Sequence, residues 1–209
     1  TATLLTGLIE GVKYYVKVRT ACAGNTFSNW ILDSLYIPCT ARTLPYTENF
    51  DGVTAPALAS CITKQDLNAG PAWNTATSGP RSSPNSMVYK FNSALPGNDW
   101  FYTAPLQLTG GTRYRLSFYY KGRSSGSIEK LEVKYGTANA ATAMNNLIFS
   151  DTAIVSTVYL QTQNEFTPAA TGVYYIGFHA FSNANQFDLN VDDIRVEASP
   201  DCSRPTNLS

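Results

Sequence analysis

The sequence predicts an all-β protein whose main part is an antiparallel β-sandwich of the jelly-roll type. Short apolar runs alternate with polar residues, as Leu116, Phe118 and Tyr120 do with Ser117 and Tyr119. This period of two is typical of strands that bury one face. Clusters of Gly, Pro, Asn and Ser separate these runs at fairly even intervals, which favours a sandwich or jelly roll. No stretch between residues 44 and 198 has the period of an amphipathic helix.

The composition restricts the kind of protein. The 209 residues carry a formal net charge of +0, and 44% are hydrophobic, 12% aromatic and 14% charged. This length suffices for one large β domain or two small ones. The low charge argues against a nucleic-acid partner, whose affinity comes from clustered Lys and Arg. No apolar run approaches the roughly 20 residues of a membrane span, so we expect no membrane insertion. Four cysteines fit an extracellular protein, where disulfides are stable.

The N-terminal segment predicts two strands, at residues 12–18 and 32–37. Two strands are too few to bury a core of their own. The pattern from Leu8 to Arg19 resembles the second half of a fibronectin type III domain. The resemblance implies that the first strands of that domain lie upstream of Thr1.

The sequence predicts that residues 44–198 form the sandwich itself. The expected strands are Tyr46–Phe50, Ser86–Phe91, Trp100–Tyr102, Arg113–Tyr120, Glu129–Tyr135, Ile154–Leu160, Gln163–Phe166, Gly172–Phe178 and Phe187–Val196. One turn of helix is expected at 138–144, after the strand that ends at Tyr135.

Four motifs in this part carry a family resemblance. They are Pro45–Gly52, Asp99–Pro105, Tyr114–Phe118 and Val191–Ile194, and they resemble, in the same order, those of cleaved-adhesin or choice-of-anchor J domains. Such domains are jelly rolls related to MAM domains, and they occur in large secreted proteins of Bacteroidetes, including the adhesin regions of gingipains. The chain departs from the family after Cys61, where the family usually has a Trp and this chain has an Ile.

The resemblance implies three parts of the chain. Residues 1–43 would be the C-terminal part of a fibronectin type III-like domain, 44–198 the MAM-like jelly roll, and 199–209 a linker with the start of a further fibronectin type III-like domain. Neighbouring domains of the same polypeptide are therefore expected partners. Membership of this family also implies export by the type IX secretion machinery.

Four cysteines allow three complete pairings. The MAM-like resemblance implies a Cys39–Cys61 disulfide, because the first cysteine pair of MAM domains flanks the first strand in the same way. By the logic of the repeats, Cys202 would belong to the downstream domain and Cys22 would pair with a cysteine upstream of the chain. The alternative is Cys22–Cys39, which would join two strands of the N-terminal segment.

An acidic cluster is the first candidate site. Glu48 and Asp51 follow one another on the first strand of the jelly roll, and Asp192 and Asp193 lie on the last. Buried carboxylates are costly unless they are paired or bind a cation. The resemblance implies that the two strands are neighbours and that they hold a structural calcium ion. Asp99 is a further candidate ligand from a loop.

The parity of the last strand decides which of its acids is expected to point inward. Asp192 is two residues before the apolar Ile194, so we expect its carboxylate to face the core. The alternative to calcium is that Asp192 and Asp193 cap a strand end or pair with Arg195 or Arg113.

Sugar binding and catalysis are the other functions considered. Trp73 lies in the polar stretch 64–86, and Tyr119 faces opposite Phe118, so both rings are candidates for an exposed sugar platform. Catalysis has little support, because His179 is the single histidine and no nucleophile motif accompanies it.

The sequence therefore predicts a non-catalytic adhesion or spacer module of a large secreted or cell-surface protein, stabilised by a disulfide and calcium. Its expected ligand is an extracellular protein or a glycan. One alternative is a carbohydrate-binding module attached to a catalytic domain elsewhere in the polypeptide. Another is an accessory region of a secreted enzyme such as a protease.

Overall fold

The computed structural model describes residues 4–200, and within them the chain is built from β-strands and two short 3-10 helices, which confirms the all-β prediction. No helix in this range is long and apolar enough to cross a membrane. The chain divides into two compact units, the first ending at Thr40 and the second beginning at Ala41.

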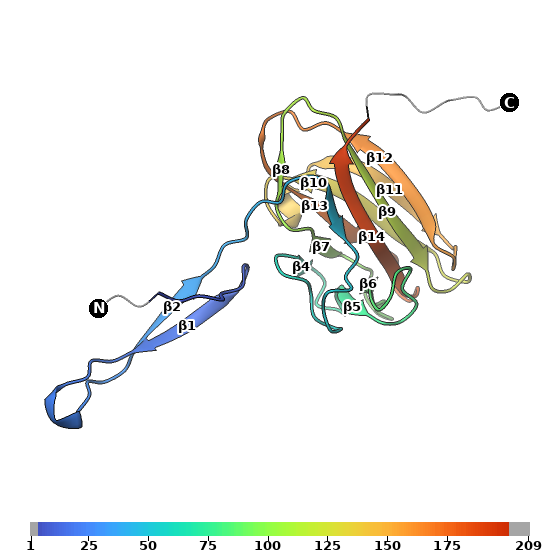
Figure 1. The fold of residues 1–209 in the computed structure, drawn as a ribbon. Helices are drawn as coiled ribbons and strands as arrows, with labels where there is room; N and C mark the ends of the chain where they lie inside the picture. Colours follow the sequence, from blue (N-terminus) through green and yellow to red (C-terminus); the bar gives the residue numbers. More distant parts are fainter. Residues whose placement is uncertain (1–3, 201–209) are drawn as a thin grey trace. The chain divides into compact units, whose positions relative to one another are not determined.

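The elements, coloured along the chain in Figure 1, have the following bounds. They are β1 (Lys13–Val18), η1 (Ala23–Asn25), β2 (Ile31–Tyr36), β3 (Tyr46–Glu48), β4 (Thr63–Asp66), β5 (Asn74–Ala76), β6 (Ser86–Tyr89), β7 (Asp99–Tyr102), β8 (Leu106–Leu108), β9 (Tyr114–Gly122), β10 (Glu129–Gly136), η2 (Ala141–Ala143), β11 (Asn146–Ile154), β12 (Leu160–Phe166), β13 (Gly172–Ala180) and β14 (Leu189–Ala198).

The first unit is an antiparallel hairpin of β1 and β2. Its register runs from the pair Lys13 and Tyr36 to the pair Val18 and Ile31. Both strands leave apolar side chains in solvent, since Ile31 is 73% exposed. A two-stranded hairpin is at best marginally stable alone. The fibronectin type III assignment of this unit stays a prediction.

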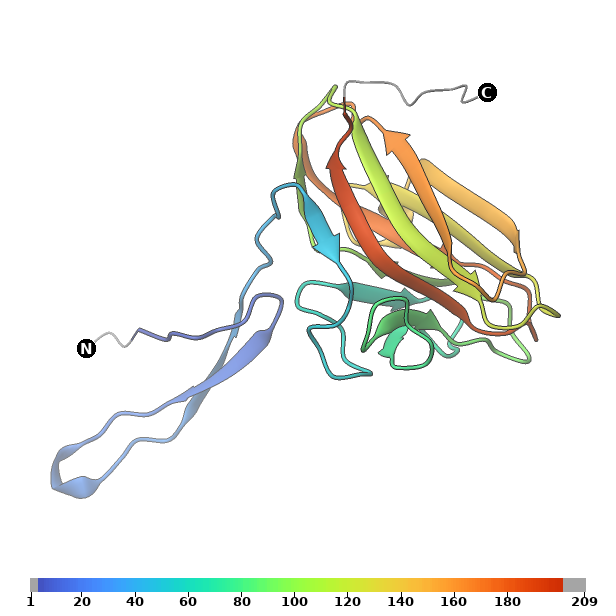
Figure 2. The same cartoon turned by 45° about the vertical axis from the view of Figure 1, so that its right-hand side comes forward.

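The second unit is a sandwich of two antiparallel sheets. One has the order β11-β10-β13-β7-β4, with β8 also paired to β13. The other has the order β12-β9-β14-β6-β5, with β3 also paired to β14. Figure 2 shows the two sheets as separate layers, with β9, β12 and β14 in the nearer one. The jelly-roll architecture predicted for residues 44–198 is therefore present.

The core between the sheets follows from the alternation seen in the sequence. Alternate residues of β9 and β10 are buried along the whole of each strand. Phe118 of β9 meets Phe178 of β13 edge to face, with ring centroids 5.2 Å apart, so these rings join the two layers. Burying a Phe side chain stabilises a fold by about 1.5–3 kcal/mol relative to exposure.

Candidate functional site: the acids of the closing strand

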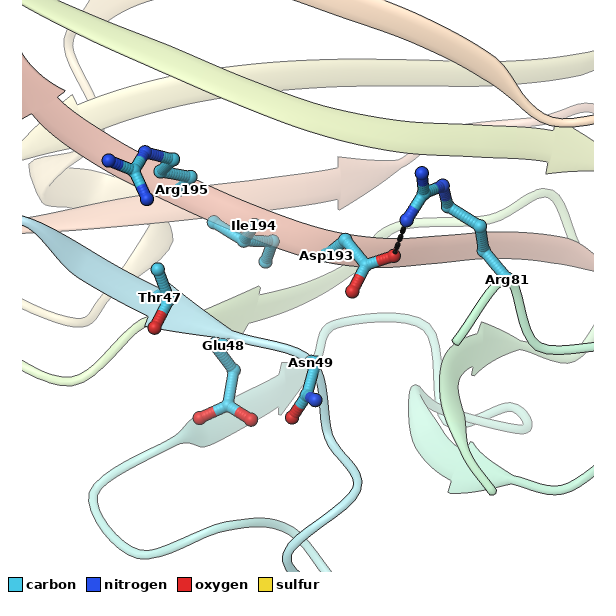
Figure 3. Close-up of a pocket in the computed structure, with 7 residues that line it drawn as sticks. All are labelled: Thr47, Glu48, Asn49, Arg81, Asp193, Ile194 and Arg195. Carbon is cyan, nitrogen blue, oxygen red and sulfur yellow. Dashed lines mark hydrogen bonds and ion pairs between the residues drawn. The ribbon is translucent and has the colours of Figure 1, made fainter. Parts of the chain in front are cut away.

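The first and last strands of the sandwich are neighbours, as predicted. β3 pairs antiparallel with β14, and Glu48 lies opposite Ile194. A pocket of about 350 Å³ lies over this pair of strands. Its lining consists of Thr47, Glu48, Asn49, Arg81, Asp193, Ile194 and Arg195 (Figure 3).

The direction of Asp192 differs from the prediction, because β14 contains a bulge. Asp193 has a positive φ of 49°, and the register with β9 shifts between Asp192 and Arg195. Val191 and Ile194 are both buried, three residues apart, so an extra residue stands between two core positions. Asp192 lies opposite Tyr119, on the outer side of the sheet. The parity argument was wrong because it assumed an unbroken period of two.

The outer side of the sheet is covered at Asp192 by residues 77–85, here called the covering loop. Oδ2 of Asp192 accepts hydrogen bonds from the backbone N–H of Arg81 at 2.8 Å and of Ser82 at 3.2 Å. Its Oδ1 accepts one from the backbone N–H of Asp193 at 2.8 Å. The carboxylate is fully buried, and it is satisfied entirely by protein N–H groups. Asp192 therefore anchors the covering loop.

Asp193 fixes the same loop through side chains. Its Oδ2 lies 2.6 Å from Nη1 of Arg81, and its Oδ1 accepts a hydrogen bond from Oγ of Ser82 at 2.9 Å. The guanidinium of Arg81 lies 3.7 Å from the centroid of the Tyr119 ring. Nδ2 of Asn190 donates to the carbonyl of Ser78 at 3.2 Å.

Arg81 was missed by the sequence reasoning. The predicted partners were Arg195 and Arg113, but Arg195 pairs with Glu197, and Arg113 with Glu165. The signal available in the sequence was the position of Arg81, a cation in the turn-rich stretch Ser78–Pro84, at a point where the acids of the last strand still needed a partner.

The acids of the first strand shape the turn that follows it. Oε1 of Glu48 accepts a hydrogen bond from the backbone N–H of Phe50 at 2.7 Å, where the chain has a positive φ. Oδ1 of Asp51 accepts one from the backbone N–H of Asn85 at 3.0 Å. Asn85 in turn donates to the carbonyls of Phe50 and Val53. These two acids hold the turn against the end of the covering loop.

The five predicted calcium ligands do not gather around one point. Glu48 and Asp193 line the same pocket, whereas Asp99 belongs to β7 in the other sheet. Within residues 4–200 no group of three or more Asp, Glu, His or Cys side chains could hold a metal ion. Calcium prefers six to eight oxygen ligands. The acids already have protein partners in this arrangement, and the calcium site stays a prediction.

Burial raises the pKa of three of these acids, Glu48, Asp192 and Asp99. It raises the pKa of Asp192 to about 7, against the opposing effect of the backbone N–H of Arg81. It raises the pKa of Asp99 to about 6, against the opposing effect of the backbone N–H of Asn98. Asp99 is fully buried, and its Oδ1 has no hydrogen-bond partner among the described residues.

These shifts predict a pH dependence of stability that Asp99→Asn should reduce. An acid with a raised pKa in the folded state binds more protons there than in the unfolded state. Its contribution to stability is therefore full below its unfolded pKa near 3.8 and is lost as the pH rises through about 6. The free energy of unfolding of Asp99→Asn, relative to that of the wild type, should be ~1–3 kcal/mol higher at pH 8 than at pH 4, since one pKa unit equals about 1.4 kcal/mol. Urea unfolding at both pH values measures this, and a constant difference would contradict it.

The sugar platform predicted at Trp73 and Tyr119 is not present. Trp73 is 0% exposed, and its Nε1 donates to the backbone carbonyl of Asp99 at 3.0 Å. Its ring meets Phe101 edge to face at 4.9 Å, so the prediction that it is exposed was wrong. Tyr119 does face outward, but Arg81 covers one face of its ring.

The single histidine is held as a structural group. The ring of His179 stacks on Trp100 with centroids 4.2 Å apart. Its Nδ1 lies 2.9 Å from Oε1 of Glu132, and its Nε2 lies 3.0 Å from Oδ1 of Asn98. Burial lowers the pKa of His179, and Glu132 partly offsets this. Both ring nitrogens have partners within the fold.

The cysteines agree with the predicted pairing. Cys39 and Cys61 form a disulfide, which excludes the alternative Cys22–Cys39. Cys22 is a free, exposed thiol. Cys202 lies outside the described residues.

Comparison with known proteins supports the fold assignment. No family model and no curated protein matches the sequence. Two cleaved adhesin domains of Lys-gingipain from Porphyromonas gingivalis superpose with TM-scores of 0.61 and 0.59, each at 16% identity. The matches cover 74% and 73% of this chain, and 98% and 96% of those domains. The chain has a cleaved-adhesin-like fold.

The same fold is shared with carbohydrate-binding modules. The CBM22-1 xylan-binding domain of Xyn10C from Paenibacillus barcinonensis has a TM-score of 0.51 and 7% identity, over 73% of this chain and 92% of that domain. At such low identity the likeness concerns the cleaved-adhesin-like fold alone. A ligand of this chain has to be inferred from its own residues.

Proposed function

We propose that this chain is a non-catalytic adhesion module of a large secreted or cell-surface protein, which binds an extracellular ligand. The observation that carries the proposal is the structural match over nearly the whole length of the cleaved adhesin domains. The Cys39–Cys61 disulfide fits an extracellular location, because disulfides persist in oxidising environments.

The geometry of the acids supports a non-catalytic role. A general acid or base needs a group within reach of a substrate proton. Asp192 is buried under the covering loop, and Asp193 is paired with Arg81. His179 is engaged at both nitrogens. The pocket over β3 and β14 thus contains side chains that hold the fold together.

A carbohydrate-binding module is the second candidate function. The likeness to a xylan-binding domain favours it, because that domain uses the same architecture. Glycan binding and adhesion are compatible, since an adhesin can hold its target through surface sugars.

The finer assignments, a MAM-like or choice-of-anchor J domain between fibronectin type III domains with type IX export, are proposed from the sequence resemblance.

Retention of coated beads tests the proposed function. Beads that carry this chain should be retained by immobilised extracellular proteins or oligosaccharides more strongly than beads that carry albumin. Mass spectrometry should find the bound ligand unchanged. The proposal is contradicted by absence of retention on every surface, or by cleavage of the ligand.

Calcium stabilisation is a separate proposal that rests on the sequence resemblance. A bound ion between β3 and β14 would have Glu48 and Asp193 as carboxylate ligands, since both line the pocket. A ligand that binds the folded state raises its stability. We therefore expect EDTA to lower the midpoint of thermal unfolding by several degrees, and added calcium to restore it. Equal midpoints in EDTA and calcium, together with an unchanged Glu48→Gln variant, would rule the ion out.

A further inference from the structure

Two aromatic rings project from the loops at one end of the sandwich. Phe91 follows β6 and Phe187 precedes β14, and their rings stack with centroids 5.4 Å apart at 26°. Phe187 is 37% exposed and Phe91 is partly buried. We call this pair the tip platform. A single exposed ring is ordinary on a protein surface, but two rings stacked side by side form a small contiguous apolar area that a ligand can contact.

Buried carboxylates hold the backbone on both sides of Phe187. Oε1 of the fully buried Glu129 accepts a hydrogen bond from the backbone N–H of Phe187 at 2.6 Å. The next residue, Asp188, is also buried, and its Oδ2 lies 2.8 Å from Nζ of Lys90 and 2.9 Å from Nη1 of Arg123. Burying carboxylates is costly. Here they fix two loops and thereby the position of an exposed ring.

Further hydrogen bonds join these loops. The backbone N–H of Asn185 donates to the carbonyl of Asn92 at 2.8 Å. The backbone N–H of Ile128 donates to Oε1 of Gln186 at 2.7 Å. The tip platform is therefore pre-organised, which lowers the entropy cost of binding.

The tip platform lies at one end of the sandwich, and the chain enters and leaves the jelly roll at the opposite end. Tyr46 pairs with Val196 at one end of β14, where the chain enters and leaves the sandwich. Leu189 pairs with Gly122 at the other end, beside the platform loops. Within the second unit, the tip platform therefore lies at the opposite end of β14 from the pairing with β3.

The chemistry around the rings indicates the class of ligand. Two rings offer an apolar area far smaller than the ~800 Å² that each partner buries in a stable protein interface. Asn92 follows Phe91 and Gln186 precedes Phe187 in the chain, and their side-chain oxygens accept hydrogen bonds from the backbone N–H groups of Ala94 and Ile128. An apolar face beside hydrogen-bonding amides and the cations of Lys90 and Arg123 complements a sugar ring and its hydroxyl groups.

We propose that the tip platform binds a glycan, with one sugar ring stacked on Phe187. This inference rests on the proposed function and specifies its ligand and its location. It places the site on the loops, away from the pocket over β3 and β14. Sequence reasoning had placed the sugar platform at Trp73 and Tyr119.

A screen of the intact chain on immobilised oligosaccharides, xylan fragments among them, tests the inference. The wild type should bind at least one oligosaccharide, and Phe187→Ala should weaken that binding about fivefold, because an aromatic contact contributes roughly 1 kcal/mol beyond burial and tenfold corresponds to about 1.4 kcal/mol. Phe187→Tyr keeps the ring and should retain binding. Phe27→Ala removes a more exposed ring, 51% against 37% for Phe187, from the first unit and should leave binding unchanged. Thermal unfolding of each variant shows whether it is folded.

The outcomes separate this inference from the proposed function. If the wild type binds oligosaccharides and folded Phe187→Ala binds them equally well, the location is wrong while adhesion stands. If the wild type binds extracellular proteins but no oligosaccharide, the glycan is overturned and adhesion again stands. If Phe187→Ala is unfolded, changes in the NMR shifts of residues 90–95 and 185–188 on adding the oligosaccharide decide, and their absence overturns the inference.

Discussion

Trp73→Ala should destabilise the protein by ~3–5 kcal/mol, the range for removing a large buried ring from a core. Trp73 is fully buried, packs against Phe101 and Tyr89, and donates a hydrogen bond to the carbonyl of Asp99. The variant leaves a cavity and removes the hydrogen bond to the carbonyl of Asp99. In thermal unfolding this should lower the midpoint by roughly 10 °C, since 1 kcal/mol corresponds to about 2–4 °C at this size.

Trp30→Ala is the matched control for this prediction. Trp30 is 56% exposed in the first unit, so its replacement should change stability by less than ~1 kcal/mol. At a temperature where Trp73→Ala is still folded, its ligand binding should equal that of the wild type. Equal stability of the two variants, or a selective loss of glycan binding in Trp73→Ala, would show that Trp73 is not a core residue.

Asp192→Ala should cost ~2–4 kcal/mol near pH 6. The substitution removes the acceptor of the backbone N–H groups of Arg81, Ser82 and Asp193. A buried group that loses its partner costs about 1–3 kcal/mol. The cost should be smaller at pH 8, because burial raises the pKa of Asp192 to about 7 and its ionised form is the less stable one there. Urea unfolding at pH 6 and pH 8 gives both values.

Asp192→Asn tests the same contacts with less change in shape. Its Oδ1 can still accept from the loop, but its Nδ2 would face the backbone N–H of Asp193, which is a donor. We expect Asp192→Asn to be less stable than the wild type and more stable than Asp192→Ala. A larger cost for either variant at pH 8 than at pH 6 would contradict the direction of the pKa shift.

The strands with a regular period were predictable from the sequence. β9, β10 and β13 have one alternating face toward the core, and the predicted segments 113–120, 129–135 and 172–178 overlap them closely. Hydrophobic periodicity reports such burial directly. The core and the sandwich architecture follow from these strands.

The edge strands were not predictable in the same way. The segment 154–160 was expected to be a strand, but it mostly connects β11 to β12. β11 was missed because most of its residues are not buried, so it has no clear alternating apolar face. Its pairing with β10, which has a register shift of its own, decides its conformation. Pairing of this kind is tertiary and leaves a weak local pattern.

The candidate site was predictable in part. The sequence identified Glu48, Asp51, Asp192 and Asp193 as acids that need partners, and the adjacency of the strands that carry them. It could not reveal the bulge at Asp193, since one extra residue reverses the side on which Asp192 lies. Nor could it reveal Arg81, because the fold of the covering loop depends on contacts more than 100 residues away in the chain.

Amide hydrogen exchange tests most directly the claim that Asp192 holds the covering loop on the sheet. The N–H groups of Arg81 and Ser82 should exchange slowly in the wild type, because a buried carboxylate accepts both. In Asp192→Ala both should exchange at the rate of an open loop, while the N–H groups shared by β9 and β12 stay protected. Equal exchange of Arg81 and Ser82 in the two proteins would contradict the anchoring role of Asp192.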